Sequence, residues 1–287
     1  MSWYRKYWDS IDQIYWDPSI LGLVSISNKK WKLNDDEISI PRDQVAKGGS
    51  IYTRRGTAAE NALRMQRLEE PLNHIFDITF GIAGDAVIQS LFYSRFGIDA
   101  LGKIDRLGRE VMDRYPGFKG GTTTQQDALF ASEDAVLGVE LKLGSPTWQG
   151  QALKYLALMV AEEKHRGARG DLGLLYVTPR SDITEISAVL GLDQSGKLPE
   201  GFIDRVPPSQ ISKTLGVLIE SNREHFESAA LRLQVRHVSW SELIADVGQI
   251  VSSLSEIELG DQTLKNLLLG FVDAVKHHDG CMVGDPD

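Results

Sequence analysis

The sequence predicts an α/β fold in which helices flank a mixed central β-sheet. Three observations support this class: short runs of β-formers such as "VLGVELKL" at 136–143, long runs of helix formers such as "QALKYLALMVAEEKHRG" at 151–167, and the alternation of the two along the chain. From residue 57 onward the expected order is helix, hairpin, helix, strand, helix, strand. This order gives a mixed sheet covered by helices.

Local signals place the individual elements. Thr57 and Glu60 have the spacing of a capping box and predict a helix over 57–70. Further helices are expected over 84–97, where Gly97 would end the helix, and over 106–115. Two strands over 122–132 and 133–144 should form a hairpin that turns around Ser132 to Asp134. The remaining expected elements are helices over 151–167, near 182–190 and over 213–230, strands over 172–180 and 231–240, and two closing helices.

Composition along the chain divides it into three parts. Residues 1–50 hold Trp3, Trp8, Trp16 and Trp31 among turn formers, and we expect this extension to pack its aromatic side chains on the core rather than to form a separate recognition arm. Residues 51–255 are expected to form the main domain, which contains the candidate functional motifs. Residues 256–287 are expected to be a C-terminal helix and a flexible tail.

Composition and charge also limit the functions to consider. Cys281 is the only cysteine, so the chain cannot form an intramolecular disulfide or a cysteine-based zinc or iron–sulfur centre. No apolar run reaches the about 20 residues that span a bilayer, and the first residues do not resemble a signal peptide; we expect a cytoplasmic protein without a membrane partner. The net charge of −9 argues against coating nucleic acid by bulk electrostatics.

The run at 136–143 contains two opposite charges, Glu140 and Lys142, two residues apart. In a strand these side chains share one face while the leucines share the other, so a solvated face is the ordinary explanation. The expected hairpin, however, also brings Asp127 beside this pair. Two carboxylates and an ammonium would then converge, and Mg²⁺ is commonly held by one or two carboxylates together with waters and substrate phosphates.

Asp127 followed by Glu140-Leu141-Lys142 resembles the acid, gap, acid-x-Lys motif of the PD-(D/E)XK nuclease superfamily. The helix at 151–167 adds a second similarity, because Gln151 and Tyr155 are four residues apart and resemble the Q-x-x-x-Y motif of the RecB-type branch. We expect these two side chains to lie away from the main buried face of their helix. The resemblance covers roughly residues 55–250 and implies a restriction-endonuclease-like core.

The resemblance also implies a role for each motif residue. Asp127 and Glu140 would bind Mg²⁺ or Mn²⁺, and Lys142 would act on the attacking water or the transition state. Gln151 and Tyr155 would contact the substrate strand. The further acid that such nucleases take from a preceding helix is assigned to Asp85 as a metal ligand, with Glu60 as its competitor.

The function expected from these motifs is metal-dependent hydrolysis of phosphodiester bonds in DNA. The alternative is a catalytically inactive nuclease-fold protein that binds nucleic acid or a partner protein, and a third interpretation is an assembly protein in which "VELKL" is only an alternating strand. The sequence leaves open endo- or exonucleolytic cleavage, RNA as the substrate, and a protein partner or homo-oligomer.

Overall fold

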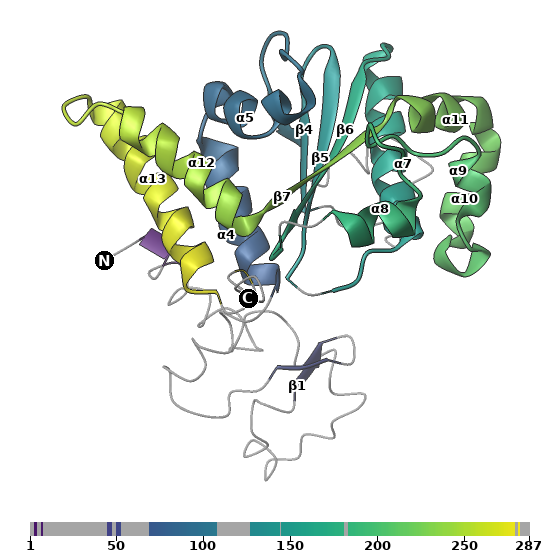
Figure 1. Ribbon diagram of the computed structural model, residues 1–287, viewed down its shortest axis with the longest axis horizontal. Helices are drawn as coiled ribbons and strands as arrows, with labels where there is room; N and C mark the ends of the chain where they lie inside the picture. Colours follow the sequence, from purple (N-terminus) through teal and green to yellow (C-terminus); the bar gives the residue numbers. More distant parts are fainter. Residues whose placement is uncertain are drawn as a thin grey trace, which may run out of the picture.

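The fold is built on a five-stranded mixed β-sheet between two layers of helices (Figure 1). The computed structural model describes residues 3, 4, 7, 45–47, 50–52, 69–107, 127–143, 145–180, 183–278 and 281. The expected α/β class with a mixed, helix-flanked sheet is confirmed. The strands lie in the order β3 (Asp105–Leu107), β4 (Ala128–Ala131), β5 (Ala135–Leu141), β6 (Asp171–Thr178) and β7 (Gln234–Ser239). The first three are antiparallel neighbours, whereas β5, β6 and β7 run parallel.

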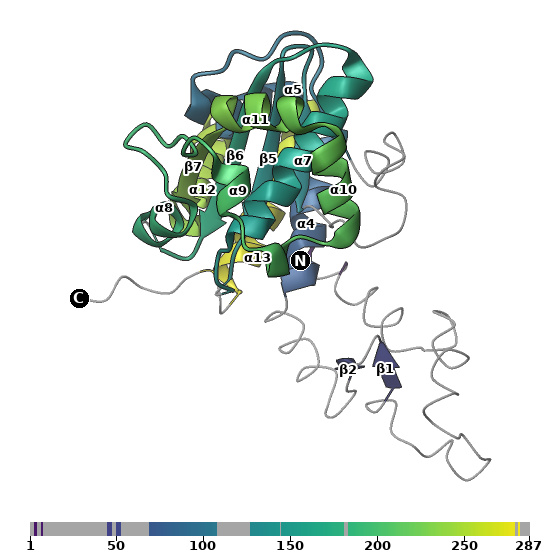
Figure 2. The ribbon, with the colours of Figure 1, turned by 90° about the vertical axis from the view of Figure 1, so that its right-hand side faces the viewer.

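The helices divide between the two faces of the sheet (Figures 1 and 2). One layer contains α4 (Glu69–Ile82), α5 (Asp85–Leu91), α12 (Trp240–Ser253) and α13 (Leu259–Lys276). The other contains α7 (Gln149–Arg166), α8 (Thr184–Leu190), α9 (Phe202–Arg205), α10 (Lys213–Ser221) and α11 (Arg223–Arg232). Short 3-10 helices are η3 (Tyr93–Phe96) and η5 (Pro208–Gln210), and a separate antiparallel pair is formed by β1 (Val45–Lys47) and β2 (Ser50–Tyr52).

Strand β5 is buried on both faces. Leu137, Val139 and Leu141 pack into the hydrophobic cluster on the α4, α12 and α13 side, as the period of two predicts. The opposite face packs against α7, and Glu140 and Lys142 are only 4% and 5% exposed. The solvated-face interpretation of this pair is therefore wrong, because a second layer of helices covers the face that the sequence pattern left polar.

Helix α7 is buried around most of its circumference. It packs on β5 and β6 with one side and on α10 and α11 with the other. Tyr155 is 1% exposed, so the expectation that it lies away from the buried face is wrong. The helix ends as predicted at Gly167, whose φ of 69° is the left-handed conformation that glycine adopts most readily.

The expected hairpin is confirmed, whereas three expected helices differ from the structure. Strands β4 and β5 are joined through Ser132 to Asp134, and the Ser132 N–H donates to the Ala135 carbonyl at 2.9 Å. The helix expected over 84–97 is the α-helix α5 followed by the 3-10 helix η3, which ends at Gly97 as predicted. The single helix expected over 213–230 is two helices, because the backbone departs from helical geometry at Asn222, with φ of −137°.

The expected helix over 106–115 begins instead in strand β3, since pairing with β4 overrides the local helical pattern. Residues 108–115 of this helix, residues 122–126 of the first expected strand, and residues 57–68 of the first expected helix lie outside the described residues.

The chain ends described by the structure contact the α4 and α13 side. The Trp3 indole N–H donates to the Leu267 carbonyl at 3.0 Å, and Tyr4 is buried. Trp8, Trp16 and Trp31 lie outside the described residues. Helix α13 shares its hydrophobic cluster with α4 and α12. Within the described ranges, no helix combines the length and hydrophobicity needed to cross a bilayer.

A buried charge network joins α7 to α11 at the hairpin end of the sheet. The Glu163 side chain is fully buried and accepts hydrogen bonds from both terminal nitrogens of Arg232, at 2.7 and 2.8 Å, and from the Gly170 N–H at 2.9 Å. His225 Nε2 lies 2.9 Å from its other oxygen. Burial raises the pKa of the Glu163 carboxyl, but these hydrogen bonds outweigh burial and lower the pKa below its ordinary value.

Gly138→Ala should destabilise the protein by about 2 kcal/mol, because an added Cβ would lie 2.5 Å from Tyr155 Cδ1 in a packed interface. Gly248→Ala in α12 is the matched control, since no atom lies within 4 Å of its added Cβ, and it should stabilise the protein by up to about 1 kcal/mol. Urea unfolding of the two variants measures both changes. Equal effects in the two variants would contradict the close approach at Gly138.

Glu163→Gln should reduce stability at neutral pH by about 3 kcal/mol, because Arg232 loses its buried counter-charge. A carboxyl with a lowered folded-state pKa stabilises the protein above its unfolded pKa and loses that contribution as the pH falls through the folded value. The wild type should therefore lose stability more steeply than Glu163→Gln below about pH 4.5. Urea unfolding across this pH range tests the difference, and parallel curves would refute it.

Candidate active site

The hairpin brings Asp127 beside Glu140. Asp127 immediately precedes β4, and because Ala128 pairs with Val139, Asp127 stands opposite the next residue of β5. Its side chain is fixed to that strand, since the Leu141 N–H donates to Asp127 Oδ2 at 2.8 Å. The predicted juxtaposition of Asp127 with the Glu140 and Lys142 segment is thus present in the fold.

Glu140, Lys142 and Gln151 form one hydrogen-bonded cluster. Lys142 Nζ lies 3.0 Å from Glu140 Oε1 and donates to Gln151 Oε1 at 2.8 Å. The Gln151 amide nitrogen in turn donates to Glu140 Oε1. A single amide at the start of α7 therefore binds both members of the charged pair and fixes their relative orientation.

Tyr155, one turn further along α7, binds the two strands instead of the charges. Its hydroxyl donates to the Val139 carbonyl at 2.7 Å and accepts from the Asp127 N–H at 3.1 Å. Burial and the nearby charges of Glu140 and Asp127 raise the pKa of the Tyr155 hydroxyl well above its ordinary value. Tyr155 thus stays protonated and holds the backbone of Asp127 against β5.

Helix α4 contributes Asn73, which the sequence reasoning missed. The Asn73 amide nitrogen donates to Asp127 Oδ1 at 2.8 Å, and its buried oxygen has no hydrogen-bond partner among the described residues. One turn later Asp77 pairs with Arg106, which also donates to the Asp127 carbonyl at 2.9 Å. The available signal was the spacing of four residues between Asn73 and Asp77, which places both on one face of the helix.

The structure does not bring Asp85 into this cluster. Asp85 is exposed at the start of α5. Its negative charge is one of those that raise the pKa of the Lys103 ammonium, after the larger effect of Asp105. Lys103 pairs with Asp105, which lies opposite Ala131 at the hairpin turn. Asp85 is therefore near the hairpin end of the sheet, on which side Figure 1 shows helix α5, whereas Glu140 lies near the carboxyl end of β5. Its competitor Glu60 lies outside the described residues.

The donor atoms of the site suit a hard cation. Asp127 and Glu140 supply carboxylate oxygens, and Asn73 supplies the amide oxygen that lacks a partner. Within the described ranges, no group of three or more His, Cys, Asp and Glu side chains is arranged to hold a metal ion. Two carboxylates are nevertheless a sufficient protein contribution for Mg²⁺, which retains several waters. Oxygen donors of this kind favour Mg²⁺ or Mn²⁺ over softer metals.

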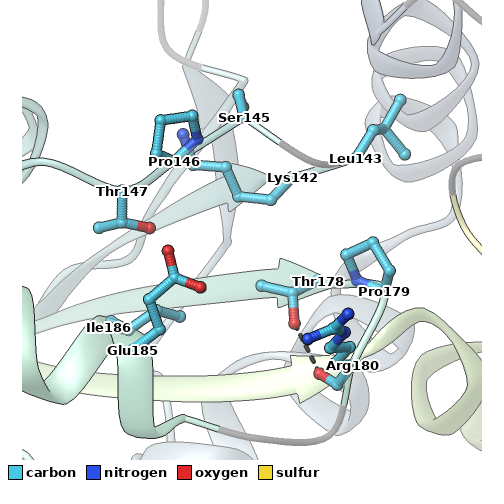
Figure 3. Close-up of a pocket in the computed structure, with 10 residues that line it drawn as sticks. All are labelled: Lys142, Leu143, Ser145, Pro146, Thr147, Thr178, Pro179, Arg180, Glu185 and Ile186. Atoms are coloured by element: carbon cyan, nitrogen blue, oxygen red, sulfur yellow. Dashed lines mark hydrogen bonds between the residues drawn. The ribbon is translucent and has the colours of Figure 1, made fainter. Parts of the chain in front are cut away.

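A cavity of about 360 Å³ opens beside Lys142, at the carboxyl ends of β5 and β6 (Figure 3). Ligands of α/β proteins commonly bind outside the carboxyl ends of parallel strands. Lys142 thus belongs both to the charged cluster and to the wall of the cavity. Its ammonium connects the buried carboxylates to a space that a small molecule can enter.

Comparison with protein-family models, with curated proteins and with solved structures finds no match to this chain. The site is therefore interpreted from its own geometry and chemistry.

Tyr155→Phe should lower the free energy of unfolding by about 2 kcal/mol, because the Val139 carbonyl and the Asp127 N–H both lose their partner. Tyr176→Phe is the matched control: Tyr176 is equally buried, but its hydroxyl makes no hydrogen bond to any described residue. Its removal should be neutral or slightly stabilising. Thermal and urea unfolding compare the two, and a larger loss in Tyr176→Phe would contradict the role given to Tyr155.

Proposed function

We propose that this protein is a Mg²⁺- or Mn²⁺-dependent nuclease that hydrolyses phosphodiester bonds in DNA, on a restriction-endonuclease-like core. The observation that carries the proposal is the convergence of Asp127, Glu140 and Lys142 where the β4–β5 hairpin meets the start of α7. Two carboxylates next to an ammonium that lines a cavity are the groups that such hydrolysis requires.

Asp127 and Glu140 would hold the cation, with the Asn73 amide oxygen next to Asp127. A bound Mg²⁺ or Mn²⁺ supplies Lewis-acid stabilisation of phosphoryl oxygens and lowers the pKa of a coordinated water. Lys142 reaches the cavity wall and would stabilise the negative charge that develops on the phosphate, or orient the attacking water. Its place beside Glu140 keeps the ammonium directed toward the carboxylates.

Gln151 and Tyr155 act in this proposal by positioning other groups. Gln151 binds both Glu140 and Lys142, which fixes the distance between the carboxylate and the ammonium. Tyr155 is buried and uses its hydroxyl on Val139 and Asp127, so it sets the position of Asp127 along β5. Substrate contact, implied for this pair by the resemblance, can come only from the less buried Gln151.

A second candidate is a nuclease-fold protein that binds nucleic acid or a partner protein without cutting. The hydrogen-bonding of the carboxylates favours it. Both oxygens of Asp127 accept protein donors, from Asn73 and Leu141, and Glu140 is paired with Lys142. Carboxylates satisfied in this way are stable without a metal ion. This candidate shares the fold and differs in predicting no divalent-cation site at Glu140.

The test incubates the purified protein with linear, circular and single-stranded DNA in Mg²⁺ or Mn²⁺. Cleavage should occur, and Lys142→Met or Asp127→Ala should slow it by about 100-fold or more, because each removes charge stabilisation of the transition state. Lys103→Met is the matched control, since Lys103 is exposed at the other end of the sheet, and its cleavage rate should equal that of the wild type.

Absence of cleavage with every substrate, or undiminished cleavage in Lys142→Met, would refute the catalytic proposal. Mn²⁺ titration separates the two candidates. A nuclease should bind Mn²⁺ at a site that Glu140→Gln weakens, whereas a protein that only binds partners should show no difference between wild type and variant. Circular dichroism confirms that each variant is folded.

A further inference from the structure

The cavity beside Lys142 is lined by charged side chains of both signs that have no role in the proposed catalysis. Arg180, at the end of β6, and Glu185, in the first turn of α8, both line it (Figure 3). Arg180 accepts a hydrogen bond from Thr178 only through its backbone carbonyl, and among the described residues neither its guanidinium nor the Glu185 carboxylate has a hydrogen-bond or ion-pair partner. The two groups also form no ion pair with each other, although they share one cavity. The cavity therefore separates a cation from an anion and leaves both available to a ligand.

The remaining walls limit the kind of ligand. Pro146, Pro179 and Ile186 give apolar surface, and Figure 3 shows the Glu185 carboxylate directed toward Thr147 across the space. A ligand that satisfies this cavity needs an anionic group for Arg180, a hydrogen-bond donor for Glu185, and a flat apolar body between them. A volume of about 360 Å³ is within the range of small-molecule sites and accommodates one nucleotide.

We propose that the cavity binds the nucleotide next to the cleaved phosphate, and that Glu185 makes it selective for a base with an exocyclic amino group. Arg180 binds the phosphate of that nucleotide, and Glu185 accepts a hydrogen bond from the amino group. This assignment rests on the proposed nuclease function, because Lys142 joins the cavity to the carboxylates.

The selectivity is sharpest between the two pyrimidines. Cytosine presents its N4 amino group to an acceptor, whereas thymine presents the O4 carbonyl at the same place. A carboxylate accepts a hydrogen bond from the cytosine amino group and is repelled by the thymine carbonyl oxygen. The two bases are similar in size, so the apolar walls contribute almost equally to both, and the difference in affinity reports on Glu185.

The experiment titrates the full chain with dCMP and with dTMP, in buffer containing EDTA, and follows binding by NMR. The dissociation constant of dCMP should be about tenfold lower than that of dTMP. Glu185→Gln should reduce this preference to less than about threefold, because an amide can both donate and accept. Arg180→Met should weaken both nucleotides to a similar extent. Glu224→Gln, an exposed acid on α11, is the matched control and should keep the wild-type preference.

Equal affinity for dCMP and dTMP, or a preference that survives in Glu185→Gln, would overturn the inference. The titration needs neither metal nor cleavage, so its failure is distinct from failure of the nuclease proposal. Selective dCMP binding by a protein that cuts no DNA would support the nucleotide site and refute catalysis. Cleavage of DNA by a protein that binds neither nucleotide would support the nuclease proposal and refute the nucleotide site.

Discussion

Helix α7 approaches β5 most closely at Gly138, where the absence of a side chain leaves room for the Tyr155 ring. That contact sets the depth of the helix on the sheet, and the tyrosine hydroxyl then reaches the Val139 carbonyl and the Asp127 N–H. One turn earlier on the same helix, Gln151 reaches Glu140 and Lys142. The arrangement of the candidate site therefore depends on the packing of one helix over one glycine.

Burying the charged pair of Glu140 and Lys142 costs free energy. Burying a carboxylate and an ammonium requires desolvation that their mutual attraction recovers only with additional hydrogen bonds. Gln151 supplies those bonds, and Trp240 donates to the Lys142 carbonyl at 2.9 Å, which fixes the strand end from the opposite layer. Hydrophobic side chains of the same size would be at least as stable here. The proposed catalytic role would account for charged groups at this position.

The hairpin could be predicted from the sequence because it depends on neighbouring residues, and the class of the sheet followed from the alternation of strands and helices. A turn at Ser132 to Asp134 fixes the register, and the register alone places Asp127 opposite Glu140. Burial of the second face of β5 could not be predicted in this way, since it depends on how α7 packs against the sheet and against α10 and α11. Asn73 was missed for the same reason: its contact with Asp127 spans 54 residues of sequence. Asp85 was misplaced because no local signal indicates which end of β5 its helix reaches.

The pairing of Lys142 with Glu140 also bears on the long-range attraction of a polyanion. Each phosphate neutralised by a free cationic side chain releases counterions and steepens the dependence of affinity on ionic strength. An ammonium already neutralised by an internal carboxylate contributes little to that release. In the proposed function, a phosphate bound at Lys142 would therefore add little to the salt dependence of DNA association, whereas a phosphate bound by the unpaired Arg180 guanidinium would add to it.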